Sequence, residues 1–209
     1  MTHREHWPLP DADAEREAVI EMAGPELTEL LARVRLMVFD CDGVLTAGNL
    51  IYGADGEALK EFDAHDGLGL MMLRPAGVAR AVLTGRTSAM VERRCTDLRF
   101  ESIKMGRFDK LAALEEIWQE TDTSADVTLY MGDDLLDLPP LAVAAVAATV
   151  PGAPLDVQAV CHITTEAEGG FGAVREVCDL VLQARGMRAE AIKALVAGGK
   201  PADDPEVTH

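Results

Sequence analysis

The sequence predicts an α/β fold with one mostly parallel sheet flanked by helices. Apolar runs at 35–40, 79–83 and 128–131 have the composition of buried strands. Helical patterns of about 10 to 15 residues alternate with such runs, which is typical of a parallel sheet. Each of these runs leads into polar residues. Because open α/β folds bind ligands beyond the carboxyl ends of their strands, the sequence also predicts a functional site at that edge.

The composition indicates an acidic globular protein. Hydrophobic residues make up 48% of the 209 residues, and 19 basic against 36 acidic residues give a formal net charge of −17. This charge disfavours nucleic acid or an anionic membrane surface as the main partner. No uninterrupted apolar stretch reaches about 18 residues, and the four cysteines form no Cys-x-x-Cys pair. We therefore expect a cytoplasmic protein with reduced thiols, and neither nucleic acid nor a membrane as partner.

Length and patterning predict one compact domain at 25–186. Residues 1–24 are polar and acidic with two prolines, and we expect a flexible extension or a frayed helix there. Residues 187–209 are alanine-rich and then acidic with prolines, and we expect a tail that leaves the domain.

The domain begins with a helix, a strand and a hairpin. Pro25 stands in the first turn of an apolar pattern spaced by three and four residues, which predicts a short helix before the strand at 35–40. A turn at Asp55-Gly56 between two short apolar runs predicts a β-hairpin at 48–62. The following helix begins near 65–67 and stops before Pro75.

Strands and helices alternate along the rest of the chain. Thr87 or Ser88 can cap a helix that runs through Cys95. A short strand at 100–105 precedes a helical pattern that opens at 107–110. The segments that complete the fold are 142–150, 157–163 and a helix at about 173–183.

Acids, a hydroxyl group and a lysine follow the predicted strands. In chain order they are Asp40, Asp42, Thr84, Lys110, Asp133, Asp134 and Asp137. Carboxylates as close in sequence as Asp40 and Asp42 repel each other, and a hard divalent cation is the usual remedy. The Asp-x-Asp-Gly segment alone would equally suit an ordinary turn. Asp134 and Asp137 would likewise suit helix caps.

The set suits the transfer of a phosphoryl group. A phosphomonoester carries about two negative charges, so an anionic nucleophile needs a divalent cation and an ammonium group to neutralise it. Asp40 and Asp133 offer hard oxygen ligands, which favours Mg²⁺. Thr84 can donate its hydroxyl to the phosphoryl group, and Lys110 can place a positive charge on it. One carboxylate of Asp-x-Asp can attack phosphorus while the other exchanges protons with the leaving group and water.

The sequence resembles the haloacid dehalogenase superfamily of phosphatases in all four of its motifs. These motifs match 40–46 (Asp-Cys-Asp-Gly-Val-Leu-Thr), 84–86 (Thr-Gly-Arg), Lys110 and 132–137 (Gly-Asp-Asp-Leu-Leu-Asp). The resemblance implies a Rossmann-like fold, with Asp40 as nucleophile and Asp42 as acid and base. It also implies Mg²⁺ held by Asp40, the main-chain carbonyl of Asp42, and Asp133.

Within the superfamily, the chain from Val34 to Arg185 is similar to the 3-deoxy-D-manno-octulosonate 8-phosphate (Kdo 8-phosphate) phosphatases. The segments that carry this resemblance are 48–52, 56–57, 60–62, 66–67, 91–95 and 172–180. It implies a capless fold with only a β-hairpin insertion, a homotetramer assembled through the hairpins, a sugar acid phosphate as substrate, and a place in lipopolysaccharide biosynthesis. Carried over by position, the substrate-binding residues are Asp63, His65, Asp66, Gly67, Arg86 and Arg94.

Several positions depart from that family's pattern. The family often has asparagine and arginine where this chain has Asp63 and His65, a basic residue near Met71, and an arginine in place of Phe171. Fewer cations would therefore face a sugar carboxylate, and Arg86 and Arg94 can also pair with surface acids. An N-acylneuraminate 9-phosphate or a related substrate stays open, as does a catalytically silent oligomerisation module.

Overall fold

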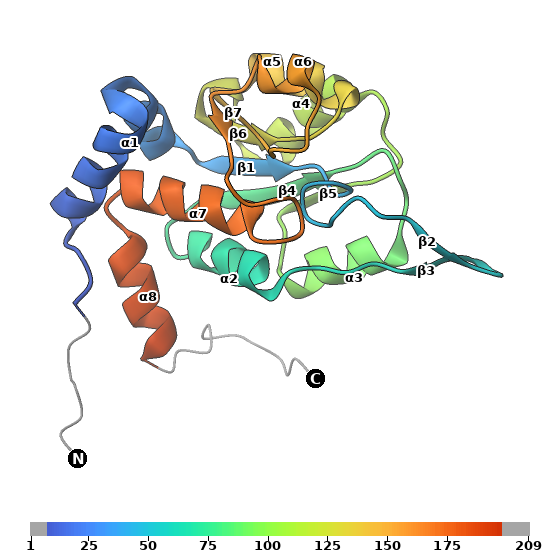
Figure 1. Ribbon diagram of the computed structural model, residues 1–209, viewed down its shortest axis with the longest axis horizontal. Coiled ribbons are helices and arrows are strands. Elements are labelled where there is room, and N and C mark those ends of the chain that lie inside the picture. Colours follow the sequence, from blue (N-terminus) through green and yellow to red (C-terminus); the bar gives the residue numbers. More distant parts are fainter. Residues whose placement is uncertain (1–7, 198–209) are drawn as a thin grey trace.

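The structure is a computed structural model and describes residues 8–197 (Figure 1). Its centre is a six-stranded parallel sheet in the order β5-β4-β1-β6-β7-β8. The strands are β1 (Leu36–Phe39), β4 (Ala79–Leu83), β5 (Ser102–Lys104), β6 (Thr128–Met131), β7 (Val146–Thr149) and β8 (Ile163–Thr164). Val38 of β1 pairs with Ala81 of β4 on one side and with Tyr130 of β6 on the other. The predicted α/β fold with its parallel sheet is confirmed.

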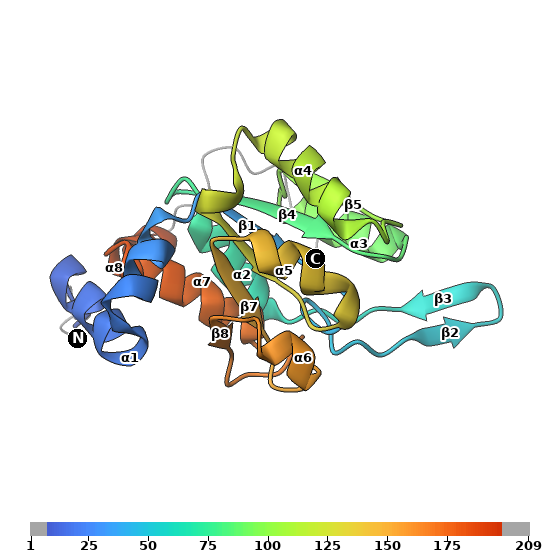
Figure 2. The same ribbon diagram turned by 90° about the horizontal axis from the view of Figure 1, so that it is seen from above.

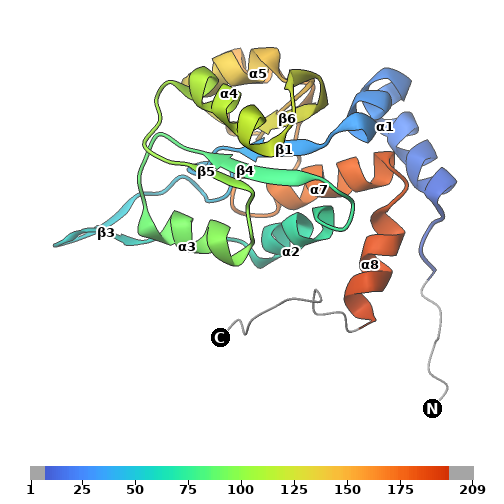
Figure 3. The ribbon, with the colours of Figure 1, turned by 180° about the vertical axis from the view of Figure 1, so that it is seen from behind.

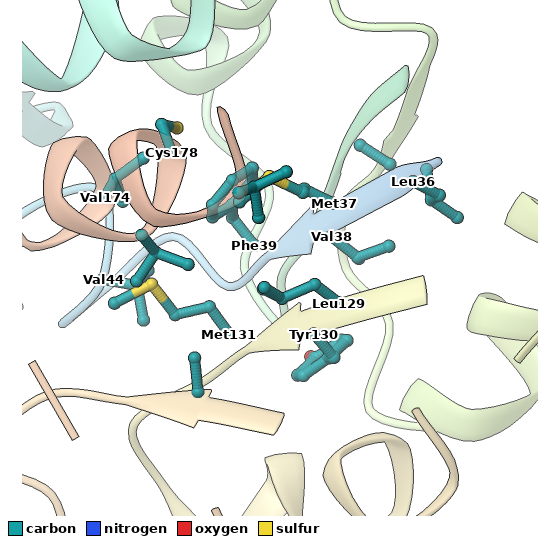
Figure 4. Packing of buried hydrophobic residues seen from close by; sticks show 14 of the residues in the cluster. Leu36, Met37, Val38, Phe39, Val44, Leu129, Tyr130, Met131, Val174 and Cys178 are labelled. Atoms are coloured by element: carbon teal, nitrogen blue, oxygen red, sulfur yellow. The ribbon is translucent and has the colours of Figure 1, made fainter. Parts of the chain in front are cut away.

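Helices cover both faces of the sheet (Figures 1 and 3). One face carries α2 (Ala64–Leu73), α3 (Ala89–Asp97) and α7 (Ala173–Ala184), and the other carries α4 (Lys110–Thr121), α5 (Leu138–Val143) and α6 (Leu155–Gln158). Single 3-10 turns at Ala125–Val127 and Leu135–Asp137 precede β6 and α5. The side chains of β1 and β6 are buried and pack together, with Val174 and Cys178 of α7 beside them (Figure 4). This packing holds the carboxyl ends of the central strands in fixed positions.

A hairpin projects from this body (Figure 2). It consists of the antiparallel strands β2 (Ile51–Gly53) and β3 (Gly56–Leu59), so the hairpin predicted at 48–62 is confirmed. Gly56 has a φ of 118°, a conformation that glycine adopts without strain. No larger element stands between β1 and α2 in the described chain. The apolar side chains of this region are exposed, namely Leu50, Ile51, Tyr52 and Leu59.

Helices at the two ends of the described chain contact each other, where the sequence predicted a flexible extension or a frayed helix at 1–24 and a tail at 187–209. Helix α1 (Ala12–Arg33) bends at Gly24, whose φ is 80°. The buried Glu15 carboxylate accepts hydrogen bonds from the main-chain N–H groups of Arg188 (3.0 Å) and Ala189 (2.6 Å) at the start of α8 (Arg188–Val196). These long-range bonds join α1 to the start of α8. Residues 1–7 and 198–209 lie outside the described residues. No helix within 8–197 is long and apolar enough to cross a membrane.

Candidate active site

Three aspartates meet at the carboxyl edge of the central strands and form an acid cluster of Asp40, Asp133 and Asp137. One carboxylate oxygen from each lies within 4.8 Å of the other two. Asp40 directly follows β1, and its N–H group donates to the carbonyl oxygen of Met131 in β6 over 2.9 Å. Asp133 follows β6 in the neighbouring loop. The sheet thus brings together the acids that the sequence places after its two middle strands.

Asp137 organises the cluster from a fully buried position. Its Oδ1 accepts hydrogen bonds from Lys110 Nζ and from the Tyr130 hydroxyl, both at 2.6 Å. Its Oδ2 accepts the main-chain N–H groups of Asp133 and Asp134, each at 3.2 Å. The capping role is therefore present for Asp137, but its bond to Lys110 was not predicted. Nothing in the spacing of 110 and 137 indicates that contact, because it depends on how α4 packs against the sheet and α5.

Lys110 is the first residue of α4 and is buried, with its side chain 3% exposed. Its Nζ lies 3.1 Å from Asp40 Oδ1 and 2.6 Å from Asp137 Oδ1. Burial favours the neutral amine, but the two carboxylates outweigh it and raise the pKa of Lys110 above its ordinary value. Lys110 therefore stays an ammonium ion beside the aspartate that was predicted to be the nucleophile.

One ammonium group does not balance the two buried acids Asp40 and Asp137 and the half-buried Asp133. Burial, followed by repulsion from Asp137, raises the pKa of Asp40 to about 6 despite the nearby Lys110. Burial and repulsion from Asp40 and Asp137 raise the pKa of Asp133 to about 7. Asp133 Oδ1 is buried without a hydrogen-bond partner. An orphaned carboxylate oxygen among hard oxygen donors fits a divalent cation such as Mg²⁺.

Asp42 lies on the opposite side of the turn after β1, among cations. Its Oδ1 accepts a hydrogen bond from Lys60 Nζ, and Arg86 Nε lies 3.5 Å from its Oδ2. Arg86 also donates a 2.8 Å hydrogen bond to the Tyr52 hydroxyl, and its guanidinium lies 5.9 Å from the centre of that ring. Lys60 and Tyr52 belong to the hairpin region and were not predicted to be site residues. The only sequence signal for Lys60 is that it lies in the segment 60–62, which resembles the Kdo 8-phosphate phosphatases.

Two glycines permit the close packing of this turn. Gly43 has a φ of 96°, and a Cβ atom there would lie 2.0 Å from Asp133 Oδ2. A Cβ atom on Gly169 would lie 1.7 Å from the carbonyl oxygen of Gly43, and Gly170 N–H donates to Val44 O over 2.9 Å. The segment at 169–170 is therefore packed against the turn that carries Asp42, with the Phe171 side chain exposed beside it.

Thr84 lies where the sequence predicted, immediately after β4, which is paired with β1. Its side chain is buried, and its Oγ1 accepts the N–H group of Arg86 over 3.4 Å. Its main-chain N–H donates to Lys104 O over 2.9 Å, which continues the pairing of β4 with β5. These contacts fix Thr84 at the same sheet edge as Asp40.

The predicted substrate-binding residues have diverse surroundings. Asp63 caps α2 by accepting the N–H groups of His65 and Asp66, and the His65 side chain is exposed. Asp66 is buried, and its Oδ1 accepts the N–H group of Arg175 over 2.7 Å, while its Oδ2 has no partner. This carboxylate holds α2 against α7, so its surroundings explain it as a structural residue.

Arg94 and Gly67 form a tight pair beside α2. Arg94 Nη2 donates to the carbonyl oxygen of Asp63 over 3.2 Å, and its guanidinium lies 5.8 Å from the centre of the Phe62 ring. A Cβ atom on Gly67 would lie 2.3 Å from Arg94 Nη2. Arg94 therefore orders the loop at 62–67, and of the two predicted arginines it is Arg86 that reaches Asp42.

Comparisons with known proteins agree with this geometry. The chain is 40% identical over 161 residues to the 3-deoxy-D-manno-octulosonate 8-phosphate phosphatase KdsC of Haemophilus influenzae, covering 77% of this chain and 89% of that protein. The crystal structure of the phosphatase of the same name from Moraxella catarrhalis, in complex with magnesium, phosphate and Kdo, is 37% identical with a TM-score of 0.78. That match covers 81% of this chain and 98% of the other.

A second structural match is the cobalt-bound deoxy-D-mannose-octulosonate 8-phosphate phosphatase of Haemophilus influenzae. It is 37% identical with a TM-score of 0.76, and the match covers 78% of this chain and 99% of the other. No protein-family model matches the chain. The identities and coverage nevertheless place the chain, on its parallel sheet and its Asp-x-Asp turn, in the Kdo 8-phosphate phosphatase family of the haloacid dehalogenase superfamily.

Proposed function

We propose that the protein is a Mg²⁺-dependent phosphatase that hydrolyses Kdo 8-phosphate to Kdo and phosphate through an aspartyl-phosphate. The observation that carries the proposal is the buried contact of Lys110 with Asp40, 3.1 Å apart, beside the unpaired oxygen of Asp133. A carboxylate with an ammonium group on one side and further hard oxygen donors on the other is equipped to attack a phosphoryl group.

The reaction takes place in two steps. A carboxylate oxygen of Asp40 forms a bond to phosphorus, the bond from phosphorus to the sugar oxygen breaks, and Asp42 gives a proton to the leaving oxygen. Asp42 then removes a proton from water as that water attacks phosphorus, and the bond to Asp40 breaks to release phosphate. Lys110 and the Thr84 hydroxyl offset the charge on the phosphoryl oxygens throughout.

Asp40, Asp133 and the main-chain carbonyl of Asp42 would hold Mg²⁺. When bound, the ion supplies Lewis-acid neutralisation of the phosphoryl group. Asp137 has a positioning role, because its carboxylate accepts hydrogen bonds from Lys110 and from the main-chain N–H groups of Asp133 and Asp134.

Arg86 and Arg94 are the proposed cations for the sugar carboxylate. Arg86 suits this role because its side chain is 38% exposed and stands beside Asp42, where the leaving oxygen must lie. His65 is exposed in the first turn of α2 and can reach the same substrate from there. Asp63 at the N-cap, Asp66 and Gly67 shape this first turn.

A substrate panel tests the proposal. Purified protein with Mg²⁺ should release phosphate from Kdo 8-phosphate with a higher kcat/KM than from N-acetylneuraminate 9-phosphate or a neutral sugar phosphate, and chelation by EDTA should stop release. Preference for the nine-carbon substrate would support the alternative sialic acid type. Folded protein that releases phosphate from none of these would support the silent oligomerisation module. In Asp40→Asn, both turnover and aspartyl-phosphate formation should be lost.

We also propose that the protein assembles as a homotetramer through its hairpins. The exposed apolar side chains of Ile51, Tyr52 and Leu59 support this, because an isolated hairpin is marginal and apolar patches favour contact with another chain. Light scattering should give four subunits for the natural sequence and fewer for Ile51→Glu. A cytoplasmic location and a place in lipopolysaccharide biosynthesis stay predictions.

A further inference from the structure

Lys60 is a lysine in an unusual environment. It follows β3 at the root of the projecting hairpin, yet its side chain is only 2% exposed. Lysines are rarely buried unless they are paired. Here the Nζ donates to Asp42 Oδ1 and lies 3.4 Å from Glu57 Oε1. The hairpin therefore sends an ammonium group into the active site of its own chain.

Lys60 is held by side-chain contacts with Glu57, which is itself hydrogen-bonded to Ser88. The Ser88 hydroxyl, at the N-cap of α3, donates to Glu57 Oε2, and Glu57 Oε1 faces Lys60. Arg86 Nε lies near the other oxygen of Asp42 but makes no hydrogen bond there. Lys60 is thus the group that fixes the direction of the Asp42 carboxylate, and it is itself anchored to the domain through Glu57.

We propose that Lys60 is a positioning residue for phosphoryl transfer, which holds the Asp42 carboxylate in the orientation that serves the leaving oxygen. The inference rests on the proposed acid role of Asp42. It gives the hairpin a chemical function within its own subunit, in addition to any part in assembly. A misplacement of about 1 Å in a reacting group can cost about 100-fold in rate.

The role predicts a dependence on the leaving group. As the bond between Asp40 and phosphorus forms, the bond to the leaving oxygen breaks, and its electron pair stays on that oxygen. A sugar alkoxide needs the proton of Asp42 at that moment, whereas a nitrophenolate is stable without it. The kcat/KM value reports events up to this step, so it isolates the use of Asp42 as an acid.

The experiment compares Kdo 8-phosphate with p-nitrophenyl phosphate in the full-length Mg²⁺-loaded protein. Lys60→Met should lower kcat/KM for the sugar phosphate about 100-fold and that for the aryl phosphate less than about fivefold. Lys60→Arg keeps a charged donor and should recover most of the loss. Lys104→Met is the matched control, because within residues 8–197 the Lys104 ammonium pairs with Glu116 and Glu120 and not with Asp42. Both rates should stay unchanged in this variant.

A merely structural role of Lys60 would lower both rates together, or shift the unfolding temperature without selectivity, and either result overturns the proposal. If Lys60→Met does not fold, Glu57→Gln tests the same support and should give a smaller loss with the same selectivity. Asp42→Asn separates the two levels of inference. If Asp42→Asn also lacks selectivity, the proposed function of Asp42 fails; if it is selective and the Lys60 variants are not, only the positioning role fails.

Discussion

Replacing Lys110 with methionine should destabilise the metal-free protein by several kcal/mol. Lys110 is the ammonium group within hydrogen-bond distance of two buried acids, 3.1 Å from Asp40 and 2.6 Å from Asp137. Methionine fills similar space but leaves both carboxylates without their cation. The loss of one partner from a buried ion pair typically costs about 3 to 5 kcal/mol.

The pKa of Asp40 allows this magnitude to be worked out at pH 8. Its pKa of about 6, against an ordinary 3.8, means that the folded protein already carries a cost of about 3 kcal/mol for keeping Asp40 ionised. The cost of keeping Asp40 ionised has an upper limit, because the folded protein can protonate Asp40 instead. At pH 8, protonating a carboxyl group of ordinary pKa costs about 6 kcal/mol. Loss of Lys110 can therefore add at most about 3 kcal/mol through Asp40. The lost charged hydrogen bond to Asp137 adds about 1.5 to 3 kcal/mol.

Urea unfolding at pH 8 in EDTA measures this difference. We expect Lys110→Met to lose about 3 to 5 kcal/mol, and Lys104→Met, which removes a more exposed pair, to lose less than about 1 kcal/mol. Titration with Mg²⁺ should return more stability to Lys110→Met than to the natural protein, since an added cation replaces the lost charge. Equal unfolding midpoints for the two variants in EDTA would refute the reasoning.

Three further predictions concern groups outside that ion pair. Burial raises the pKa of Asp66 to about 6, so the folded state holds its proton to higher pH than the unfolded chain. The free energy of unfolding should therefore fall by about 2 kcal/mol between pH 4 and pH 7, and urea unfolding of Asp66→Asn should lack this contribution. Glu15→Gln should lose about 1 to 2 kcal/mol and speed hydrogen exchange in α8, whereas Glu17→Gln on the exposed face of the same helix should do neither. Gly169→Ala must displace the carbonyl of Gly43 and should lower kcat/KM more than about tenfold, which a phosphate-release assay would detect; unchanged activity would contradict the close packing.

The sheet and the acids at its edge were predictable because they depend on local patterns. A run such as Leu36–Phe39 has to be buried, and polar residues directly after it must lie at the carboxyl edge. The same reasoning located Thr84 after β4 and Asp133 after β6. It could not assign the partners of Asp137, because Lys110 arrives from a helix 27 residues earlier in the chain.

The docked termini and the buried lysine show the limit more clearly. Glu15 and Arg188 are separated by 173 residues. The sequence around Glu15 is polar and acidic and that around Arg188 is alanine-rich, so neither locally indicates a docked helix. Lys60 follows an exposed strand, where a lysine is ordinarily solvated. In both cases hydrogen bonds to residues distant in the sequence hold the side chain in place, and no local periodicity encodes such bonds.

Asp40 and Asp42 of the Asp-x-Asp turn have neighbours from different structural elements. This difference affects how the choice of substrate can change in this fold. Asp40 is surrounded by Lys110, Asp133 and Asp137, which belong to the sheet edge and α4. The proposed mechanism uses these residues for any phosphomonoester. The neighbours of Asp42 come instead from the hairpin root and the loop after β4, the elements that we propose face the sugar. Under the proposed mechanism, substitutions there can alter the sugar that is accepted without touching Asp40. They also act on Asp42, the residue proposed to protonate the leaving oxygen. Changes of substrate should therefore be coupled to the leaving-group step, and much less to the formation of the bond between Asp40 and phosphorus.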